Sequence, residues 1–200
     1  DINKTISANG YFMSDIDTQI ADKEKQITDA LTTAMRDQKG VRDEDLENIR
    51  GYMQELQMLE DDKLSIYREQ QMSQFDTLDL KLKSGNLDQQ GIADLLISTD
   101  EAYDQSVIAI KEEFEGRQAT INSLYAVERK SIVENENLTG QAKSEALKQW
   151  QARKDNELLE SMRQENELLA ESAKSRDYTY NQALEQSNKL VEKADFNFDI

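Results

Sequence analysis

Apolar and small side chains recur every three or four residues over most of the chain, the spacing of one face of an α-helix. The clearest run lies between Gly85 and Asn137 and carries one narrow stripe: Leu96, Thr99, Tyr103, Ser106, Ile110, Phe114, Ile121 and Leu124. Runs of similar length lie on both sides of it. The pattern therefore predicts several long helices, each with one narrow contact face.

Four helices are predicted, over about residues 14–39, 43–84, 88–135 and 144–194. Residues 1–13 show no helical period and are expected to form an irregular lead-in. The alternation of Phe196, Phe198 and Ile200 predicts an extended tail over 195–200. Residues 14–194 are expected to form a single elongated helical region.

The other three helices have predicted contact faces of the same kind. These are Ile16, Ile20, Ile27, Leu31, Ala34 and Met35 in the first helix; Leu46, Ile49, Met53, Leu56, Leu59, Ile66, Met72, Phe75, Leu78 and Leu82 in the second; and Leu147, Trp150, Leu158, Met162, Leu169, Ala173, Tyr180, Leu184 and Val191 in the fourth. Thr99, Ser106 and Arg117 are polar residues on the third contact face. Polar residues within a contact face weaken the association between helices, so we expect that the helices can rearrange.

Glycines interrupt the stripes at Gly40, Gly85 and Gly140, where the chain can turn. The three junctions are about fifty residues apart, which suggests hairpins of matched length. Short turns place neighbouring helices antiparallel. The predicted fold is therefore all-α, an antiparallel coiled-coil bundle of helical hairpins. The alternative is an extended oligomeric coiled-coil rod with the helices end to end.

Two junctions also carry signals for the start of a helix. Asp88 is a good N-cap residue, because its carboxylate can accept a backbone N–H of the first turn. Val41 with Leu46, and Leu87 with Ile92, have the five-residue spacing of a hydrophobic staple.

The composition supports long helices in thin packing. The chain of 200 residues has no proline and seven glycines, and it is 37% hydrophobic and 32% charged. Proline interrupts helix interiors, so its absence favours uninterrupted helices. The hydrophobic share is below the ~45–50% of average globular proteins, which argues against a thick core.

The charge balance limits the expected partners. There are 24 Lys and Arg against 41 Asp and Glu, with a net charge of −17, so no direct nucleic-acid binding is expected. No apolar run reaches the ~20 residues of a membrane span, and no membrane contact is expected from this segment. The chain opens at Asp1 without a methionine, so we expect a segment of a longer parent.

Acidic residues cluster in four places. The clusters are Asp43-Glu44-Asp45, Asp61-Asp62, Asp100-Glu101-Asp104 and Glu112-Glu113-Glu115. They could be divalent-cation ligands or an acid–base pair, since Ca²⁺ takes six to eight oxygen ligands. In so acidic a chain we expect solvated helix faces and no metal site.

The segment Asn135-x-Asn137-x-Thr139-Gly140 resembles the front of a calcium-binding loop. Asparagine stands where such loops open with aspartate, and Ala146 stands where they need a bidentate glutamate. No metal is expected there either.

The aromatic residues Trp150, Tyr103, Tyr125, Tyr178 and Tyr180 could stack on a ligand. At helical spacing beside leucines they are expected to pack where helices meet. The chain has no histidine and no cysteine, and no glycine-rich phosphate loop. We therefore expect no enzyme activity, no catalytic residue and no cofactor.

Two stretches resemble helical segments of tail tape measure proteins from long-tailed bacteriophages of Gram-positive bacteria. One runs from Asp37-Gln38-Lys39-Gly40 through Val41 and the acids to Leu46-Glu47-Asn48-Ile49-Arg50-Gly51-Tyr52-Met53-Gln54-Glu55-Leu56. The other is Tyr103-Asp104-Gln105-Ser106, followed by Ile108, Ile110 and the acidic run into Phe114. The similarity in the general pattern of apolar and charged residues extends from about residue 14 to residue 194.

The resemblance implies a structural protein of the virion tail, assembled in the bacterial cytoplasm. Such a protein lies inside the tail tube, sets tail length and leaves ahead of the DNA. Its implied partners are tail tube and tail-assembly proteins, together with self-association through coiled-coil contact faces. No catalytic residue is implied. Two alternatives remain open from the residues alone: a coiled-coil adaptor or binding module, and a spacer stalk of a bacterial surface or secretion protein.

Overall fold

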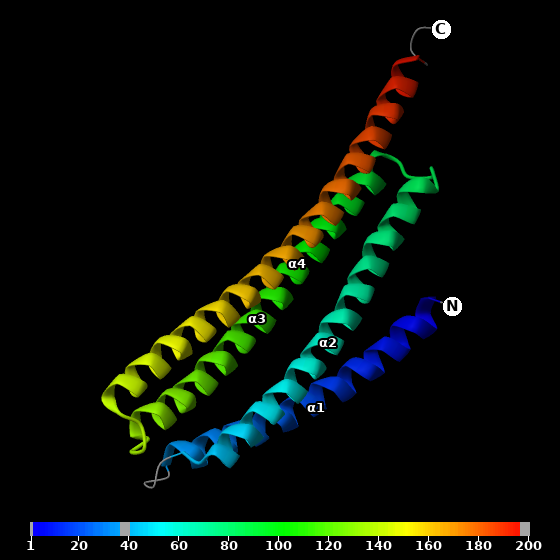
Figure 1. Ribbon diagram of the computed structural model, residues 1–200. Helices are drawn as coiled ribbons and strands as arrows, with labels where there is room; N and C mark the ends of the chain where they lie inside the picture. The colour runs from blue at the N-terminus through cyan, green and yellow to red at the C-terminus, as the bar shows by residue number, and fades with distance from the viewer. Residues whose placement is uncertain (1, 37–40, 197–200) are drawn as a thin grey trace. The chain divides into compact units, whose positions relative to one another are not determined.

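The computed structural model describes residues 2–36 and 41–196, with side chains over 15–36 and 41–194. It has four helices: α1 (Ile2–Arg36), α2 (Asp43–Lys83), α3 (Gln89–Glu134) and α4 (Gly140–Phe196) (Figure 1). No strand occurs in the described ranges. The predicted all-α class is confirmed, and the bounds of α2 and α3 agree with the prediction to within one residue.

The first helix starts earlier than predicted. α1 begins at Ile2, so residues 2–13 are helical and the prediction of an irregular lead-in is wrong. This stretch contains Asn9-Gly10, a pair typical of turns, but a single glycine inside a helix costs only about 1 kcal/mol and no proline follows it. The predicted end of this helix, at residue 39 before Gly40, lies outside the described residues.

The fourth helix also starts earlier, at Gly140 instead of residue 144. Thr139 is its N-cap residue, because the Thr139 hydroxyl oxygen accepts the backbone N–H of Ala142 at 3.1 Å. α4 continues to Phe196, so the predicted extended tail is wrong at residues 195 and 196. Residues 197–200 lie outside the described chain.

The turn between α2 and α3 is built as predicted. Asp88 accepts the backbone N–H of Gly91 at 2.7 Å, which caps α3. Leu87 packs against the apolar cluster that contains Ile92, which is consistent with the predicted staple. Gly85 has a φ of 69°, in the left-handed region that favours glycine.

Replacing Gly85 with alanine is expected to destabilise the fold, whereas replacing Gly116 with alanine is expected to stabilise it. A Cβ atom at either position meets nothing within 4 Å, so only backbone conformation matters. The left-handed φ of residue 85 costs alanine about 1 kcal/mol, and alanine gains about 1 kcal/mol over glycine inside α3. Urea unfolding of both variants checks the opposite signs, and two changes of the same sign would contradict this account.

The chain divides into two compact units. The first comprises Asp1–Tyr67 with Phe114–Arg163, and the second comprises Arg68–Glu113 with Gln164–Ile200. Because α2, α3 and α4 each contribute to both units, neither unit is a continuous piece of sequence. The expectation of a single elongated region over 14–194 stays a prediction.

In the first unit, consecutive helices pack antiparallel. Between α1 and α2, Asp17 pairs with Lys63 at 2.9 Å. Lys23, about two turns further along α1, pairs with Glu55, about two turns back along α2. Contacts between α2 and α3 and between α3 and α4 also run in opposite directions. The core is two apolar clusters, Ile20, Ile27 and Leu56 in one and Ala34, Leu46, Ile49, Leu124 and Val127 in the other.

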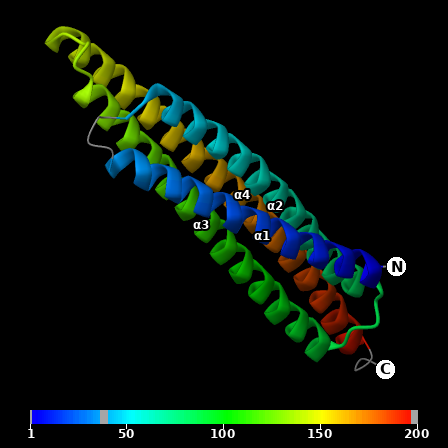
Figure 2. The same cartoon turned by 90° about the horizontal axis from the view of Figure 1, so that it is seen from below.

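In the second unit, the ends of α2 and α3 that flank their turn pack together with α4. Their shared apolar cluster is Phe75, Leu78, Leu82, Ile92, Leu95 and Ala183. α3 and α4 lie side by side here and run in opposite directions (Figures 1 and 2). The predicted antiparallel hairpin is therefore present in each unit, with no need of a second chain.

Within the described residues, no helix combines the length and apolar character needed to cross a membrane.

Candidate functional site

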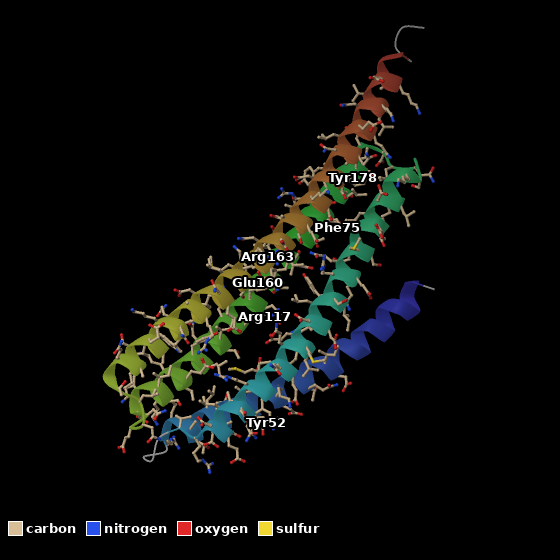
Figure 3. The ribbon with its side chains drawn as sticks, viewed as in Figure 1. Tyr52, Phe75, Arg117, Glu160, Arg163 and Tyr178 are labelled. Atoms are coloured by element: carbon tan, nitrogen blue, oxygen red, sulfur yellow. The ribbon has the colours of Figure 1, made fainter. Side chains whose placement is uncertain are left out.

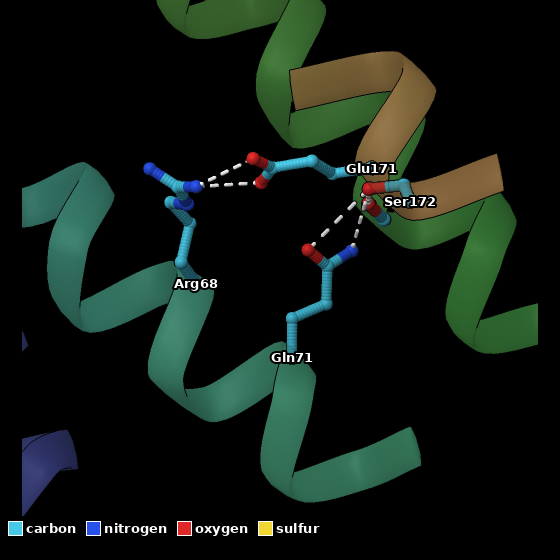
Figure 4. A network of polar contacts seen from close by, with 5 residues as sticks. Arg68, Gln71, Glu171 and Ser172 are labelled. Atoms are coloured by element: carbon cyan, nitrogen blue, oxygen red, sulfur yellow. Dashed lines mark hydrogen bonds and ion pairs between the residues drawn. The ribbon is translucent and has the colours of Figure 1, made fainter. Parts of the chain in front are cut away.

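Small polar side chains fill the centre of the second unit, where α3, α4 and α2 meet. The hydroxyl oxygens of Ser106 and Ser172 lie 2.7 Å apart, and the Gln71 amide donates to the Ser172 hydroxyl at 3.3 Å (Figure 4). Ser106 is completely buried and Ser172 is 4% exposed. We term Gln71, Ser106 and Ser172 the polar seam. Its hydrogen bonds join three helices at one level.

Two threonines lie on the same helix faces and are also buried. The Thr99 hydroxyl donates to the carbonyl of Leu95 at 2.8 Å, and the Thr179 hydroxyl donates to the carbonyl of Ser175 at 3.2 Å. Each hydroxyl is thus satisfied within its own helix and can pack as an apolar group. Small side chains of this kind allow α3 and α4 to approach closely.

Charged and aromatic residues flank the polar seam. Arg68 of α2 donates to both carboxylate oxygens of Glu171 of α4, at 2.8 and 2.6 Å (Figure 4). The Arg176 guanidinium lies 4.2 Å from the ring centre of Tyr103, a cation–π contact between α4 and α3. The polar seam is therefore enclosed by contacts between helices at its edges.

The Tyr180 hydroxyl donates to the carboxylate of Asp100, and this hydrogen bond raises the pKa of Tyr180 above its usual value of about 10. Because the folded pKa exceeds the unfolded one, the protonated tyrosine stabilises the fold at neutral pH. That contribution is lost as pH rises through the folded pKa.

We therefore expect the unfolding free energy to fall more steeply above pH 10 in the parent chain than in a Tyr180→Phe variant. Urea unfolding across the alkaline range measures the difference. Identical pH profiles would show that Tyr180 does not donate to Asp100.

The first unit has a buried ion pair between α3 and α2. The guanidinium of Arg117 lies 3.3 Å from the carboxylate of Glu60, and the two side chains are only 8% and 9% exposed (Figure 3). Arg117 also reaches the exposed carboxylate of Asp61 at 3.2 Å and lies 5.0 Å from the ring centre of Phe114. Desolvated charges are costly unless they are paired, so this contact fixes how α2 lies against α3.

A second buried carboxylate lies further along α3. Glu128 accepts two hydrogen bonds from Arg50 of α2, at 2.9 and 2.5 Å. Arg153 of α4 is 3.7 Å from the other oxygen of Glu128. One carboxylate thus links three helices.

Trp150 and Tyr125 join α4 to α3 beside this carboxylate. The indole N–H of Trp150 donates to the backbone carbonyl of Tyr125 at 2.8 Å. The two rings pack edge to face, with their centres 6.3 Å apart. Burial, followed by the hydrogen bond to Glu157, raises the pKa of Tyr125 well above its usual range. The tyrosine is held neutral as a packing residue.

The acidic clusters do not converge on one point. Asp45 accepts two hydrogen bonds from Arg42, both at 2.9 Å, while Asp61 pairs with Arg117 and Asp100 accepts from Tyr180. In the described part of the chain, no three carboxylates lie close enough together to hold a metal ion.

The oxygens of the calcium-like loop serve the backbone of the turn. The side-chain carbonyl of Asn135 accepts the backbone N–H of Asn137 at 2.9 Å, and Thr139 caps α4. A cavity of about 920 Å³ opens beside this turn and includes Arg42 and Lys143. Arg42 is bound to Asp45, and Lys143 donates to the carbonyl of Val133 at 2.8 Å. These two cations are therefore already engaged.

The prediction that the aromatic residues pack where helices meet is correct for four of the five residues. Trp150 and Tyr125 are buried, and Tyr103 and Tyr180 are partly buried in contacts between helices. Tyr178 is about half exposed, so its predicted packing is wrong (Figure 3).

The predicted contact face of α3 is correct, whereas that of α4 is correct only in part: Trp150 is buried, but Met162 and Leu184 are about half exposed. Met35, Met72, Met162, Leu184 and Val191 were predicted to pack between helices and are instead about half exposed or more. On α4 the buried residues are Trp150, Ser161, Ser172, Thr179 and Ala183. Apolar spacing alone misses small polar residues that fit a close contact. The recurrence of serine, threonine and alanine at three- and four-residue steps is the signal that identifies them.

No family model, curated protein or solved structure matches the chain. The contacts themselves position helices. The serine hydroxyls of the polar seam neighbour an amide, which is not a base at neutral pH. Arg50, Arg68 and Arg117 are paired with carboxylates of other helices, which favours the observed pairing of these helices.

Proposed function

We propose that this chain is a structural helical segment of a tail tape measure protein from a long-tailed bacteriophage of Gram-positive bacteria. In this role it occupies the tail tube of the virion, after assembly in the bacterial cytoplasm, and helps to set tail length. Tail tube and tail-assembly proteins are its partners. The proposal assigns no catalysis and no cofactor to this segment.

One observation supports a structural role most directly: the four helices are 35, 41, 46 and 57 residues long and are joined by short turns. In an α-helix, length is proportional to residue number at about 1.5 Å per residue. A protein that measures distance by its extent needs that property. The resemblance of the stretches around residues 37–56 and 103–114 to tape measure proteins supports the choice of this class among structural proteins.

Moderately stable contacts between helices also suit the proposal. The polar seam and the buried ion pairs replace part of the apolar surface that would otherwise hold the helices together. Replacing such groups by well-packed apolar residues is often neutral or stabilising, so these contacts are specific without being especially strong. Helices held in this way can change partners when a tail is assembled.

Tail length in the phage that encodes the chain tests the proposal. An in-frame deletion of 42 residues of helix is expected to shorten the tail by up to about 60 Å, and inserting an unrelated helix of the same length should restore it. Electron microscopy of the virions measures both. Tails of normal length, or failed assembly that the unrelated helix does not rescue, would instead favour an adaptor. A gene that lies among surface or secretion genes, with no tail genes beside it, would favour a spacer stalk.

A further inference from the structure

One face of α3 in the second unit carries exposed apolar side chains between acidic ones. Ile97 and Ile108 are each 58% exposed and lie eleven residues apart, about three helical turns or ~16 Å. The exposed acids Asp94, Glu101, Asp104 and Glu112 lie on the same face, so that acids and isoleucines together follow one another at steps of three and four residues. We term these six residues the α3 stripe.

The carboxylates of the α3 stripe are largely unneutralised. Among the described residues, the carboxylates of Glu101, Asp104 and Glu112 make no ion pair and no hydrogen bond, and the Asp94 carboxylate accepts only from the neutral Gln90 amide, at 2.8 Å. Some other acids of the second unit have basic partners: Asp79 pairs with Lys83, Glu171 with Arg68, and Glu185 with Lys189. Within the α3 stripe, Glu101 and Asp104 are only three residues apart, and like charges this close along a helix are destabilising. The α3 stripe thus keeps an unfavourable arrangement that a cationic partner would relieve.

We propose that the α3 stripe is the docking surface for a basic amphipathic helix of another protein. Such a helix would place two apolar side chains, three turns apart, over Ile97 and Ile108. Its lysines and arginines would pair with the carboxylates between and beside them. This goes beyond the proposed structural role and does not depend on its being a phage tail protein.

Three features determine this choice of partner. The two isoleucines have the spacing of anchor residues in helix recognition, in which apolar side chains recur on one face. The charge of the α3 stripe selects a basic partner and speeds association. It also disfavours a second copy of this chain, which carries a net charge of −17.

The test measures binding of a synthetic helical peptide of about 20 residues to the full chain by fluorescence anisotropy. The peptide has leucines eleven residues apart, with lysines on the same face, and the comparison peptide has the same composition in shuffled order. We expect the patterned peptide to bind at least tenfold more tightly than the shuffled one. Binding should weaken as salt rises.

Variants of the chain separate specific docking from general attraction. Ile97→Ser/Ile108→Ser is expected to weaken binding about tenfold or more, and so is Glu101→Gln/Asp104→Asn/Glu112→Gln. The matched control, Glu24→Gln/Glu47→Gln/Glu145→Gln, removes the same charge from exposed positions outside the α3 stripe and should bind as the parent does. Circular dichroism verifies that every variant folds.

Two results would overturn the proposal. In the first, the shuffled peptide binds the parent chain as tightly as the patterned peptide does, or the control variant loses as much affinity for the patterned peptide as the α3 stripe variants do. In the second, analytical ultracentrifugation shows a dimer that Ile97→Ser/Ile108→Ser dissociates, so that a second copy of the chain covers the α3 stripe.

Discussion

Replacing Arg117 with alanine is expected to lower the free energy of unfolding by about 3–5 kcal/mol. The guanidinium is almost fully buried against Glu60 and lies over the ring of Phe114. Its removal takes away the charge that compensates a carboxylate that is itself only 9% exposed. Urea unfolding followed by circular dichroism measures the loss.

A double variant separates the cost of leaving the Glu60 carboxylate without its partner from the cost of losing the packing of the Arg117 side chain. Glu60→Leu/Arg117→Met removes both charges and fills the site with apolar side chains, so most of the lost stability should return. If the double variant is no more stable than Arg117→Ala, the desolvated carboxylate is not the source of the cost. The Arg117 side chain would then act mainly through its packing.

Replacing Phe114 with alanine is expected to cost about 3–5 kcal/mol, because the truncation leaves a cavity inside the first unit. Phe114 is the largest fully buried side chain among the described residues. The unfolding free energy of the variant is measured in the same way as for Arg117.

Leu159→Ala is the matched control, since Leu159 is a large apolar residue of α4 that is mostly exposed. Its replacement should change stability by no more than about 0.5 kcal/mol. Similar losses at Phe114 and Leu159 would show that burial does not distinguish them. Because Phe114 touches Arg117, the combined variant should lose less than the sum of the two single losses.

The helices themselves were predictable from the sequence because their signals are local. The proline-free stretches, the cap at Asp88 and the apolar pair at the α2–α3 turn each act within a few residues. The contact face of α3 was also predictable, including the polar members Thr99, Ser106 and Arg117, which are all buried. In α3 the large apolar residues and the small polar ones share one face.

The pairing of side chains between helices was not predictable in the same way. Nothing in the pattern of α3 alone indicates that Ser106 meets Ser172 or that Arg117 meets Glu60. Those contacts depend on the relative positions of two helices, which a single-helix period does not determine. On α4 the prediction was wrong for the same reason. Hydrophobicity predicts that Leu184 is buried, whereas the close contact between helices buries the smaller Thr179 and Ala183.

The acidic clusters illustrate a related limit. Their exposure was predicted, but the partners of Asp45, Asp61 and Asp100 are of three different kinds: an arginine just before the same helix, a buried arginine of another helix and a tyrosine of another helix. A sequence shows that a carboxylate is present. Its partner is set by the fold.

The central structural claim is that α3 and α4 of one chain pair with each other as an antiparallel hairpin. A cysteine pair tests this most directly, because the chain has no cysteine of its own. The Ser106 and Ser172 hydroxyl oxygens lie 2.7 Å apart, so Ser106→Cys/Ser172→Cys places two thiols within disulfide reach. Ser98→Cys/Ser172→Cys is the control, with one cysteine at an exposed position two turns away.

Mild oxidation followed by a non-reducing gel gives the answer. A disulfide within the monomer of Ser106→Cys/Ser172→Cys, absent from the control, is the result that this fold predicts. A disulfide-linked dimer, or no bridge in either variant, would contradict the hairpin and favour a rod in which helices of separate chains pair.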